Sequence, residues 1–429
     1  MKHNTDMLIV GGGTIGLSAA YHAARRGLKV TLIDRFPVPP TGGPNDFGSS
    51  RGLERMFRIL YSQQERVRLV ETAYAMWHEL EQQVGGAPIL AEQDLLFFGN
   101  PDISTFEGNI HDIAASMDQL GIPYDSLEDP AAIAKRYPIF RPEALRTPDG
   151  VPYVGLVQNN GATINVQRAF QVVRGLADRT GRVSTAVGLV TSIACELSGD
   201  WVVTTDDGAR YHASYLVLCP GVWLGGLLAQ FGLAPASKAG AAWSIWQMSL
   251  AYFPRAAGSS VHWPIWYEFG NTKTDADRLF YGFPDVGFTP DTTGRLKISA
   301  DYTYSTFTDP AAATRVPDPR LIGDIQAHLR ELLQPGVLDI DHPTLEQACL
   351  YSMSPDGDMV LGRIPVAPEV EQFWPNAALF CMASGRGFKY TPLFGRVLVD
   401  LATTGKTAYQ ADLSDFSTTR AGIFQRLSG

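Results

Sequence analysis

Three glycines near the N-terminus have the spacing of a phosphate-binding loop. Gly11, Gly13 and Gly16 form the pattern G-x-G-x-x-G directly between an apolar run at residues 6–10 and a helical stretch. In such a loop the first glycine permits a tight turn, the second lets a pyrophosphate approach the backbone, and the third lets the helix pack on the strand. The N–H groups at the start of the helix favour the charge of the pyrophosphate. The pattern therefore predicts a dinucleotide site.

An acidic residue follows where a dinucleotide site needs one. Asp34 ends the next apolar run, about 20 residues after the glycine loop, where a carboxylate can hold ribose hydroxyl groups. The same carboxylate would repel the 2′-phosphate of NADP. Asp34 therefore argues against NADP, but it does not separate NAD from FAD.

Basic residues further along could hold a carboxylate. Arg55 and Arg58 lie three residues apart, so on a helix they would share one face. A planar guanidinium group suits bidentate binding of a carboxylate. A solvated basic turn is the alternative, and Arg51 fits that description. Lys389 follows an apolar strand and a glycine-rich turn between two aromatic residues, which favours a lysine that faces a site over one on the surface.

The elements that position these residues follow from the apolar pattern. Residues 6–10 and 29–33 are predicted strands on either side of a helix at 17–26, which makes a βαβ unit whose helix ends at Gly27. The proline- and glycine-rich residues 37–45 must form a loop. An amphipathic helix is expected over residues 64–83, with Val67, Leu69, Val70, Ala73 and Trp77 as core contacts.

The rest of the chain reads as strands with a helix near the end. Strands are predicted at residues 183–193, 201–204, 215–219 and 379–383, a strand facing solvent or a cavity at 296–303, and a helix at 392–402. This order predicts a nucleotide domain whose pieces lie at both ends of the chain, with a sheet-rich domain inserted.

Composition narrows the function classes. The 429 residues are 45% hydrophobic and 18% charged, and the net charge of −9 argues against nucleic acid as a main partner. The four cysteines have neither C-x-x-C nor zinc-ligand spacing, so no metal site is expected. The first apolar run is too short for a signal peptide or a membrane span. We expect a soluble, cytoplasmic protein without a membrane or nucleic-acid partner.

Three segments identify a family. Residues 48–61 (GSSRGLERMFRILY), 349–356 (CLYSMSPD) and 384–396 (SGRGFKYTPLFGR) resemble, in matching order, the sarcosine oxidase and N-methyltryptophan oxidase branch of the D-amino-acid-oxidase-like flavoproteins. The chain also resembles the nikkomycin-pathway oxidase of a cyclic amino acid and the glycine oxidases. The resemblance covers nearly the whole chain, ending with residues 416–420.

The resemblance implies an α/β fold with two domains. It implies a glutathione-reductase-like FAD domain with a Rossmann-type parallel sheet and a second, mixed-sheet α+β substrate domain. The predicted division gives residues 1–85, 156–230 and 341–429 to the FAD-binding domain, and 86–155 and 231–340 to the substrate domain.

The cofactor that the resemblance implies is FAD. Relatives often join the flavin through C8α to the cysteine of a C-x-Y-x-x-x-P-D segment, which Cys349, Tyr351, Pro355 and Asp356 match. A small buried apolar residue is the alternative for Cys349. The residues expected to contact FAD are Gly11, Gly13, Thr14, Ile15, Gly16, Asp34, Arg35, Ser49, Ser50, Arg55, Cys349, Gly385, Gly387 and Lys389.

By the same resemblance, Arg58 is the anchor of the substrate carboxylate and Lys389 its second partner, with Arg55 near the flavin. Arg386 replaces the histidine or aromatic residue of relatives, which suggests a further anionic or hydrogen-bonding group on the substrate. Lys297 aligns with the lysine that activates oxygen in sarcosine oxidase, where a cation stabilises developing superoxide. A lysine on an exposed strand is the alternative.

Two acids and a group of aromatic residues complete the expected substrate site. Asp301 stands where sarcosine oxidases have histidine and could bind an amine or imine N–H, and Glu107 matches an acid of the nikkomycin-pathway relative. Tyr281 is expected to contact the substrate. The aromatic residues suggest a larger apolar pocket than sarcosine needs: Trp243, Trp246, Trp263, Trp266, Tyr267 and Tyr281.

The first functional hypothesis is an oxidase of a secondary amine that carries a carboxylate, an N-substituted or cyclic amino acid. Hydride transfer to the flavin gives an imine, and oxygen regenerates the flavin with release of hydrogen peroxide. The alternatives are a dehydrogenase that passes electrons to another protein, and a non-enzymatic flavin-binding subunit of a complex. An amino-acid-like small molecule and oxygen are the expected partners, and a monomer is expected.

Overall fold

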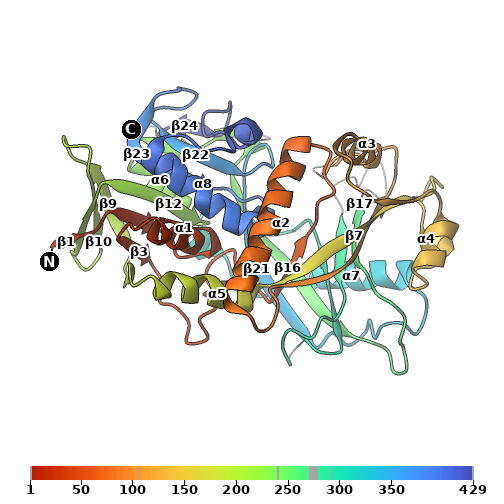
Figure 1. The fold of residues 1–429 in the computed structure, drawn as a ribbon. Helices are drawn as coiled ribbons and strands as arrows, with labels where there is room; N and C mark the ends of the chain where they lie inside the picture. The colour runs from red at the N-terminus through yellow and green to blue at the C-terminus, as the bar shows by residue number, and fades with distance from the viewer. Residues whose placement is uncertain (1, 106, 239–240, 270–278, 291, 428–429) are drawn as a thin grey trace.

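The computed structural model describes residues 2–105, 107–238, 241–269, 279–290 and 292–427, and its chain forms two lobes, each built around a β-sheet (Figure 1). Both ends of the chain lie in the lobe on the left of Figure 1. Within the described residues, no helix combines the length and the apolar character that a membrane span requires.

The predicted βαβ unit is present at the start of the chain. β2 (Met7–Val10) and β3 (Val30–Asp34) pair in parallel, and α1 (Thr14–Arg25) connects them. The helix begins three residues earlier than predicted because Gly13 is its N-cap, so the glycine loop leads directly into the first turn. Gly27 has a φ of +88° just beyond the helix, as expected for its end.

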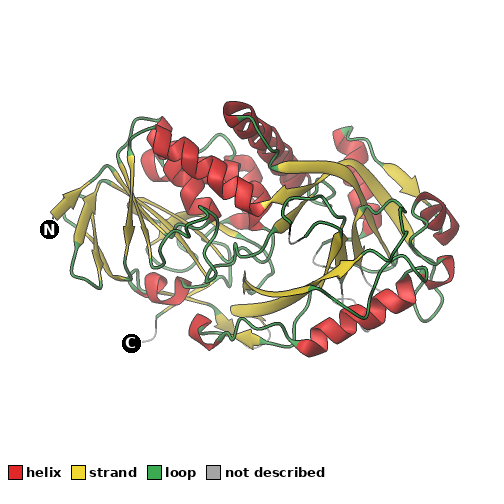
Figure 2. Ribbon diagram, turned by 90° about the horizontal axis from the view of Figure 1, so that it is seen from below, coloured by secondary structure: helices red, strands yellow, loops and turns green. Residues whose placement is uncertain are grey.

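The βαβ unit belongs to a six-stranded sheet with the order β22-β23-β12-β2-β3-β8. All neighbours are parallel except β22 at the edge, and α1, α5 and α8 cover one face (Figure 2). The other face packs against a four-stranded sheet, β1-β11-β10-β9. The bounds are β8 (Val183–Val187), β12 (Tyr215–Gly221), β22 (Val360–Pro365), β23 (Phe373–Cys381), α5 (Val166–Arg179), α8 (Thr391–Thr404), β1 (Lys2–Asn4), β9 (Val190–Cys195), β10 (Trp201–Thr205) and β11 (Arg210–Ala213).

The second lobe contains a ten-stranded mixed sheet. Its main order is β20-β16-β19-β18-β17-β5-β7-β4, with β21 paired to β16 and β6 paired to β7. The pair β17 and β5 is parallel and the other pairs described in this sheet are antiparallel. The bounds are β4 (Glu54–Phe57), β5 (Leu90–Gly99), β6 (Asp125–Leu127), β7 (Val154–Asn165), β16 (Ser244–Pro254), β17 (Ile265–Phe269), β18 (Phe280–Phe283), β19 (Arg295–Ala300), β20 (Thr306–Phe307) and β21 (Leu345–Met353).

Helices surround this sheet and join the two lobes. α7 (Pro319–Leu332) packs on β16 and β19, and α2 (Gln64–Val84) lies between the lobes, in contact with both α8 and α3 (Figure 1). The five predicted core contacts of α2 are all buried. The remaining elements are α3 (Ile110–Leu120), α4 (Pro130–Arg136), α6 (Leu224–Ala229), β13 (Leu233–Pro235), β14 (Ser237–Lys238), β15 (Ala241–Ala242), β24 (Phe424–Arg426) and 3₁₀ turns at Pro142–Ala144, Pro310–Ala312, Gly387–Tyr390 and Gln410–Phe416.

The junction between β7 and α5 has no loop. Asn165 is the last residue of β7, and its side-chain Oδ1 accepts the backbone N–H of Arg168 at 2.9 Å as the N-cap of α5. Its own N–H donates to the carbonyl of Ile89 at 2.7 Å, and the N–H of Val166 donates to Leu53 at 3.0 Å. A strand of the large sheet thus becomes a helix of the nucleotide lobe within one residue.

Two sequence predictions of secondary structure are wrong, and the helix considered for Arg55 and Arg58 is not present. Arg55 lies on strand β4 and Arg58 just after it, so they do not share the face of a helix. The predicted strand at residues 183–193 is divided at Gly188 into β8 and β9, which belong to different sheets. The segment at 296–303 does not alternate, because Leu296 to Ala300 of β19 are buried on both sides.

Strand pairing also departs from the predicted division into domains. β4, most of β7 and β21 lie in the large sheet, although residues 1–85, 156–230 and 341–429 were given to the FAD-binding domain. These strands extend from the nucleotide lobe into the other lobe, and two of them carry residues of the candidate site.

Candidate functional site

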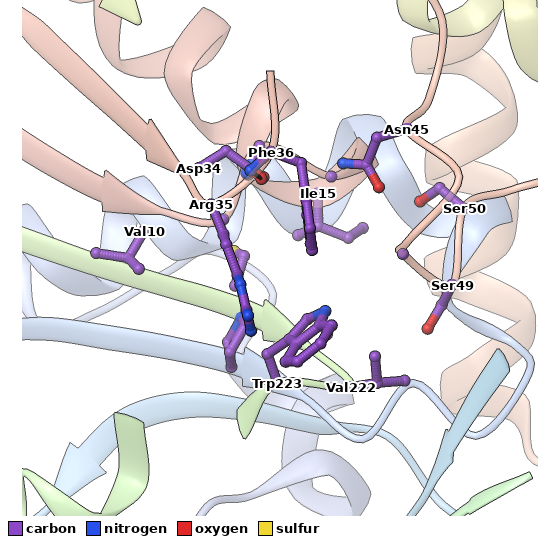
Figure 3. A pocket seen from close by; sticks show the side chains of 18 of the residues that line it. Val10, Ile15, Asp34, Arg35, Phe36, Asn45, Ser49, Ser50, Val222 and Trp223 are labelled. Atoms are coloured by element: carbon purple, nitrogen blue, oxygen red, sulfur yellow. Dashed lines mark hydrogen bonds between the residues drawn. The ribbon is translucent and has the colours of Figure 1, made fainter. Parts of the chain in front are cut away.

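A cavity of about 720 Å³ opens at the carboxyl ends of β2, β3, β12 and β23 (Figure 3). In an open parallel sheet this edge is where dinucleotides bind. The predicted glycines, Thr14, Ile15, Asp34, Arg35, Ser49, Ser50, Arg55, Gly385 and Gly387 all line it.

The glycine loop is shaped by close backbone approaches. A Cβ on Gly11, whose φ is +102°, would lie 2.1 Å from the carbonyl oxygen of Cys219, and one on Gly16 would lie 1.9 Å from the carbonyl oxygen of Gly11. Both contacts involve backbone, which cannot yield cheaply, so only glycine fits. A Cβ on Gly13 would meet only Ser50 Oγ at 3.9 Å, so the space beside this glycine is open to a ligand.

Asp34 faces the same loop. Its Oδ2 accepts the N–H of Gly12 at 2.5 Å and its Oδ1 accepts that of Phe36 at 2.8 Å. Burial raises the pKa of this carboxyl, while those two hydrogen bonds oppose the rise. The carboxylate is thus fixed at the tip of β3 with lone pairs left for hydroxyl groups.

Trp223 and Ser49, which line the large cavity, each carry a buried polar atom that points to a ligand. The guanidinium carbon of Arg35 lies 4.3 Å from the ring centroid of Trp223, and these two residues lie side by side in Figure 3. Among the described residues, neither Trp223 Nε1 nor Ser49 Oγ has a hydrogen-bond partner, although both atoms are buried. Buried polar groups are nearly always satisfied, so these atoms indicate where a polar ligand completes the wall.

A smaller cavity of about 80 Å³ adjoins the first one. The two share Arg55, Tyr351, Gly385 and Phe388 in their linings. Gly385, with a φ of +73°, lies against Tyr351, since a Cβ there would come within 2.6 Å of its ring. All the residues predicted for substrate or catalysis line this smaller cavity, together with Cys349: Arg58, Glu107, Tyr281, Lys297, Asp301, Arg386 and Lys389.

Arg58 is held firmly on one side of the smaller cavity. Its side chain is buried, its Nη1 donates to the carbonyl of Leu60 at 2.7 Å, and its guanidinium carbon lies 4.2 Å from the ring centroid of Tyr61 and 5.2 Å from that of Phe97. Glu107, also buried, forms ion pairs with Arg58 and with Arg386, in the latter case at 3.0 Å between Nε and Oε1. Glu107 thus pairs with the guanidinium group predicted to hold substrate.

Lys389 is buried beside Arg58 in the turn that leads into α8. Its Nζ donates to the carbonyl of Arg386 at 3.3 Å, and its own carbonyl accepts the indole N–H of Trp77 at 2.9 Å. Burial lowers the pKa of Lys389, and the phenol of Tyr61 opposes that effect. Burial opposes ionisation of that phenol, but the charges of Lys389 and Arg58 outweigh it and lower the pKa of Tyr61 to about 6.

Lys297 lies on the opposite side of the cavity, on the buried strand β19. Its Nζ donates to the carbonyl of Glu54 at 2.8 Å and lies 4.4 Å from the ring centroid of Phe283. Burial and the charge of Arg55 lower the pKa of Lys297 to about 8, and Glu54 acts in the other direction. Glu54 is itself only 2% exposed, and burial raises the pKa of its carboxyl.

Cys349 lies on β21 between this lysine and the shared wall. Its thiol is free and buried, and burial raises its pKa although Arg55 and Lys297 favour the thiolate. Arg55 donates to three backbone carbonyls, those of Glu54, Ser49 and Arg51, so its guanidinium is fixed where the two cavities meet.

Asp301 follows β19 and faces a set of phenols. Its Oδ2 accepts the hydroxyl of Tyr267 at 2.8 Å, and Tyr281 and Tyr351 approach each other at 3.4 Å between hydroxyl oxygens. Burial raises the pKa of all three tyrosines, so their hydroxyl groups are hydrogen-bond donors near neutral pH.

The predicted aromatic pocket is wrong as a single group. Trp263 and Trp266 are buried in the core of the large sheet, and Trp246 hydrogen-bonds to Ser244. Trp243 lines the large cavity, and only Tyr267 and Tyr281 of the group reach the smaller one. Aromatic richness in this segment therefore reflects core packing more than a pocket.

Sequence reasoning missed three residues of the site. Trp223 stands four residues beyond the predicted strand 215–219, and its place after the carboxyl end of a parallel strand was an available signal. Glu54 and Tyr61 gave no such signal, because Glu54 is enclosed by strands distant in the sequence and Tyr61 lies against Lys389 of a distant turn.

Comparison with known proteins gives the class of protein. Residues 6–401 match the model of the DAO family, described as FAD dependent oxidoreductase, so the chain belongs to this family. It is an oxidoreductase whose cofactor is FAD. The open space at Gly13 and the unpaired polar groups of Ser49 and Trp223 fit such a cofactor.

Individual relatives cover the whole chain. It is 28% identical over 424 residues to N-methyl-L-tryptophan oxidase of Escherichia coli O7:K1, covering 97% of this chain and 99% of that protein. The structure of NikD, an unusual amino acid oxidase essential for nikkomycin biosynthesis, matches with 29% identity, a TM-score of 0.79 and full coverage of both chains. Glycine oxidase of Geobacillus kaustophilus, at 18% identity and a TM-score of 0.72 over 97% of this chain and 99% of its own, supports the fold.

Proposed function

We propose that the protein is an oxidase of a secondary amine that carries a carboxylate, either an N-substituted or a cyclic amino acid. The observation that carries this proposal is the cluster of Arg58, Arg386 and Lys389 on one wall of a small cavity next to the FAD cavity. The named activities of the relatives, N-methyl-L-tryptophan oxidase and the amino acid oxidase NikD, support the same class of substrate.

In this proposal Arg58 and Lys389 bind the substrate carboxylate. A rigid guanidinium group and a buried ammonium group give a carboxylate charge-assisted hydrogen bonds that water cannot replace. The guanidinium group of Arg58 is kept in one orientation because it stacks on Tyr61 and donates a hydrogen bond to the carbonyl of Leu60. Arg386, on the same wall, provides for a second acceptor group on the substrate.

Asp301 and Tyr281 then face the amine. A carboxylate that already accepts from Tyr267 can also accept an amine or imine N–H, and Tyr281 on β18 lines the same cavity. The bound FAD supplies the hydride acceptor, and the amine must be neutral when hydride leaves the α carbon. The protein's part is to orient the C–H bond, match charges and exclude water.

Lys297 is proposed to assist the reaction with oxygen, which returns FAD to its oxidised form and yields hydrogen peroxide. A buried cation stabilises negative charge that develops on oxygen, and it does so without reorganisation. Lys297 is buried, hydrogen-bonded to backbone and in the same cavity as Cys349. Cys349 is proposed to carry the covalent link to the flavin.

An anaerobic substrate screen tests the proposal. Purified holoenzyme is mixed without oxygen with sarcosine, N-methyltryptophan, proline, pipecolate and piperideine carboxylate, and loss of the visible absorbance of oxidised flavin is followed. We expect one structural subset to bleach the flavin and to produce peroxide when air is admitted. A protein that stays yellow with the whole panel would show that the carboxylate-anchored amine is the wrong substrate class.

A matched pair of variants locates the anchor. Arg58→Lys keeps the charge but removes the planar fork, so we expect KM to rise by about tenfold to a hundredfold, since one charge-assisted bond is lost. Arg179→Lys, on the exposed end of α5, is the control and should leave KM unchanged.

In the substrate screen, bleaching of the wild-type flavin without formation of peroxide would favour a dehydrogenase over an oxidase.

A further inference from the structure

The carboxylate of Glu107 pairs with Arg58, which is proposed to anchor the substrate carboxylate. One of its oxygens pairs with Arg58 and the other with Arg386. The side chains of Arg58 and Glu107 are each 4% exposed, and that of Arg386 is 11% exposed. A carboxylate bridging two buried guanidinium groups is the arrangement that a bound substrate would make there.

Glu107 reaches this position from a loop with an anchored base. The loop connects β5 to α3, and Asn109 ties it by donating to the carbonyls of Pro101 and Ile103, both at 2.9 Å. Thr105 and Gly108 are joined by two backbone hydrogen bonds, and the N–H of Glu107 donates to Thr105 Oγ1 at 3.1 Å. Asp102 in the same loop is exposed, so water is close to this segment.

The two arginines are held independently of Glu107. Arg58 is fixed by Leu60 and by its stacking on Tyr61, and Arg386 donates from Nη1 to the carbonyl of Gly357 at 2.8 Å. Withdrawal of Glu107 therefore leaves the guanidinium groups of both arginines in place. Replacing one carboxylate by another also leaves no buried charge without a counterion, which would otherwise be strongly unfavourable.

The volume of the smaller cavity also supports displacement of Glu107 by the substrate. The smaller cavity has a volume of only about 80 Å³, against about 720 Å³ for the large cavity. An amino acid with a substituted nitrogen needs more room than this. Glu107 is one of the lining residues, and its withdrawal would provide both the room and the anchor.

We propose that Glu107 is an internal competitor that occupies the carboxylate anchor of the substrate-free enzyme and is displaced by the substrate carboxylate. This inference rests on the proposed function, because it takes Arg58 as an anchor of the substrate carboxylate. Glu107 thereby favours full substrates over simple carboxylates. Any ligand that displaces Glu107 loses the free energy of the internal ion pairs. A full substrate compensates for this loss through additional contacts to Asp301 and Tyr281, whereas a simple carboxylate cannot. The apparent affinity for simple carboxylates is lowered by the fraction of molecules in which the anchor is already filled.

Ligand titration of the oxidised holoenzyme tests the proposal without turnover. Acetate and benzoate are added to wild type, Glu107→Gln and the control Asp102→Asn, and Kd is read from the change in the flavin spectrum. We expect Kd for both carboxylates to fall at least tenfold in Glu107→Gln and to stay within twofold of wild type in Asp102→Asn. Unchanged or weaker binding to both Glu107→Gln and Glu107→Ala would overturn the proposal, since Glu107 would then be neutral or a direct contact of the ligand.

A second variant covers the case in which the glutamine retains the bridge. Glu107→Ala removes the side chain, so acetate itself should fill the vacated place and compete with benzoate in this variant. Absence of competition between acetate and benzoate there would also overturn the proposal. The flavin content of each variant confirms that the holoenzyme is intact.

These readouts separate the inference from the proposed function. If no amine of the substrate screen reduces the flavin but carboxylates bind more tightly to Glu107→Gln, the role of Glu107 as an internal competitor is supported and the proposed substrate class is wrong. If amines of the screen reduce the flavin but the affinity for carboxylates does not rise in the variants, the proposed function is supported and the role of Glu107 as a competitor is refuted.

Discussion

The charge of Lys297 should control how fast the reduced enzyme reacts with oxygen. This lysine is buried on β19 and donates to the carbonyl of Glu54, and its pKa is lowered to about 8 by burial and by Arg55. Lysine is the cation below its pKa and neutral above it, so the stabilisation of negative charge on oxygen is present at lower pH and is lost as pH rises through that value.

The magnitude follows from the titration. A lysine with a pKa of about 8 is about nine-tenths protonated near pH 7 and about one-tenth protonated near pH 9. The oxygen reaction should therefore slow by nearly tenfold across that range. Removing the cation altogether, in Lys297→Met, should cost on the order of a hundredfold, typical of one lost electrostatic contact in a preorganised site.

Stopped-flow reoxidation is the direct assay. Holoenzyme is reduced anaerobically with dithionite or light and mixed with oxygenated buffer at a series of pH values, so no amine substrate is needed. Lys135→Met, which removes an exposed lysine of α4, is the matched control. A rate that is independent of pH, together with a Lys297→Met variant within threefold of wild type, would refute the electrostatic role.

Three further changes have defined outcomes. Gly16→Ala places a Cβ 1.9 Å from the carbonyl oxygen of Gly11, so we expect purified protein with little or no FAD, measured by its absorbance ratio; a fully loaded variant would contradict the close approach. Cys349→Ser should release FAD into the supernatant after acid precipitation, whereas the wild-type flavin stays in the pellet; release from both would exclude the covalent link. Trp266→Ala empties a fully buried position between Phe98 and Phe140 and should destabilise the protein by about 3–5 kcal/mol, measured by urea unfolding, with the partly exposed Trp246→Ala as a milder control.

Local patterns in the sequence were sufficient for the nucleotide end of the molecule. The glycine loop, Asp34 and the apolar runs around them define the βαβ unit, because turn geometry, helix packing and charge all act over a few residues there. The same holds for α2, whose periodicity identified its buried face. The family resemblance then supplied the residues that the structure gathers around the second cavity.

Non-local pairing accounts for the failures. No strand was predicted at residues 54–57, because they pair with β7, about a hundred positions later, and pairing at that distance leaves no local signal. β19 was expected to alternate, yet α7 covers one side and the cavity wall fills the other. Glu54 is buried only because Lys297 and Tyr252 from distant strands enclose it. Burial set by partners of this kind cannot be obtained from a window of sequence.

The loop-free junction at Asn165 constrains how the molecule can move. Since β7 becomes α5 within one residue, with hydrogen bonds to Ile89 and Leu53 on either side, this crossing offers no pivot about which the lobes could swing. Hinged domain closure, familiar from many enzymes with two lobes, is therefore not available at this point in the chain. Any motion that gives the substrate access therefore has to leave this junction intact, and short segments such as the loop of Glu107 can move without disturbing it.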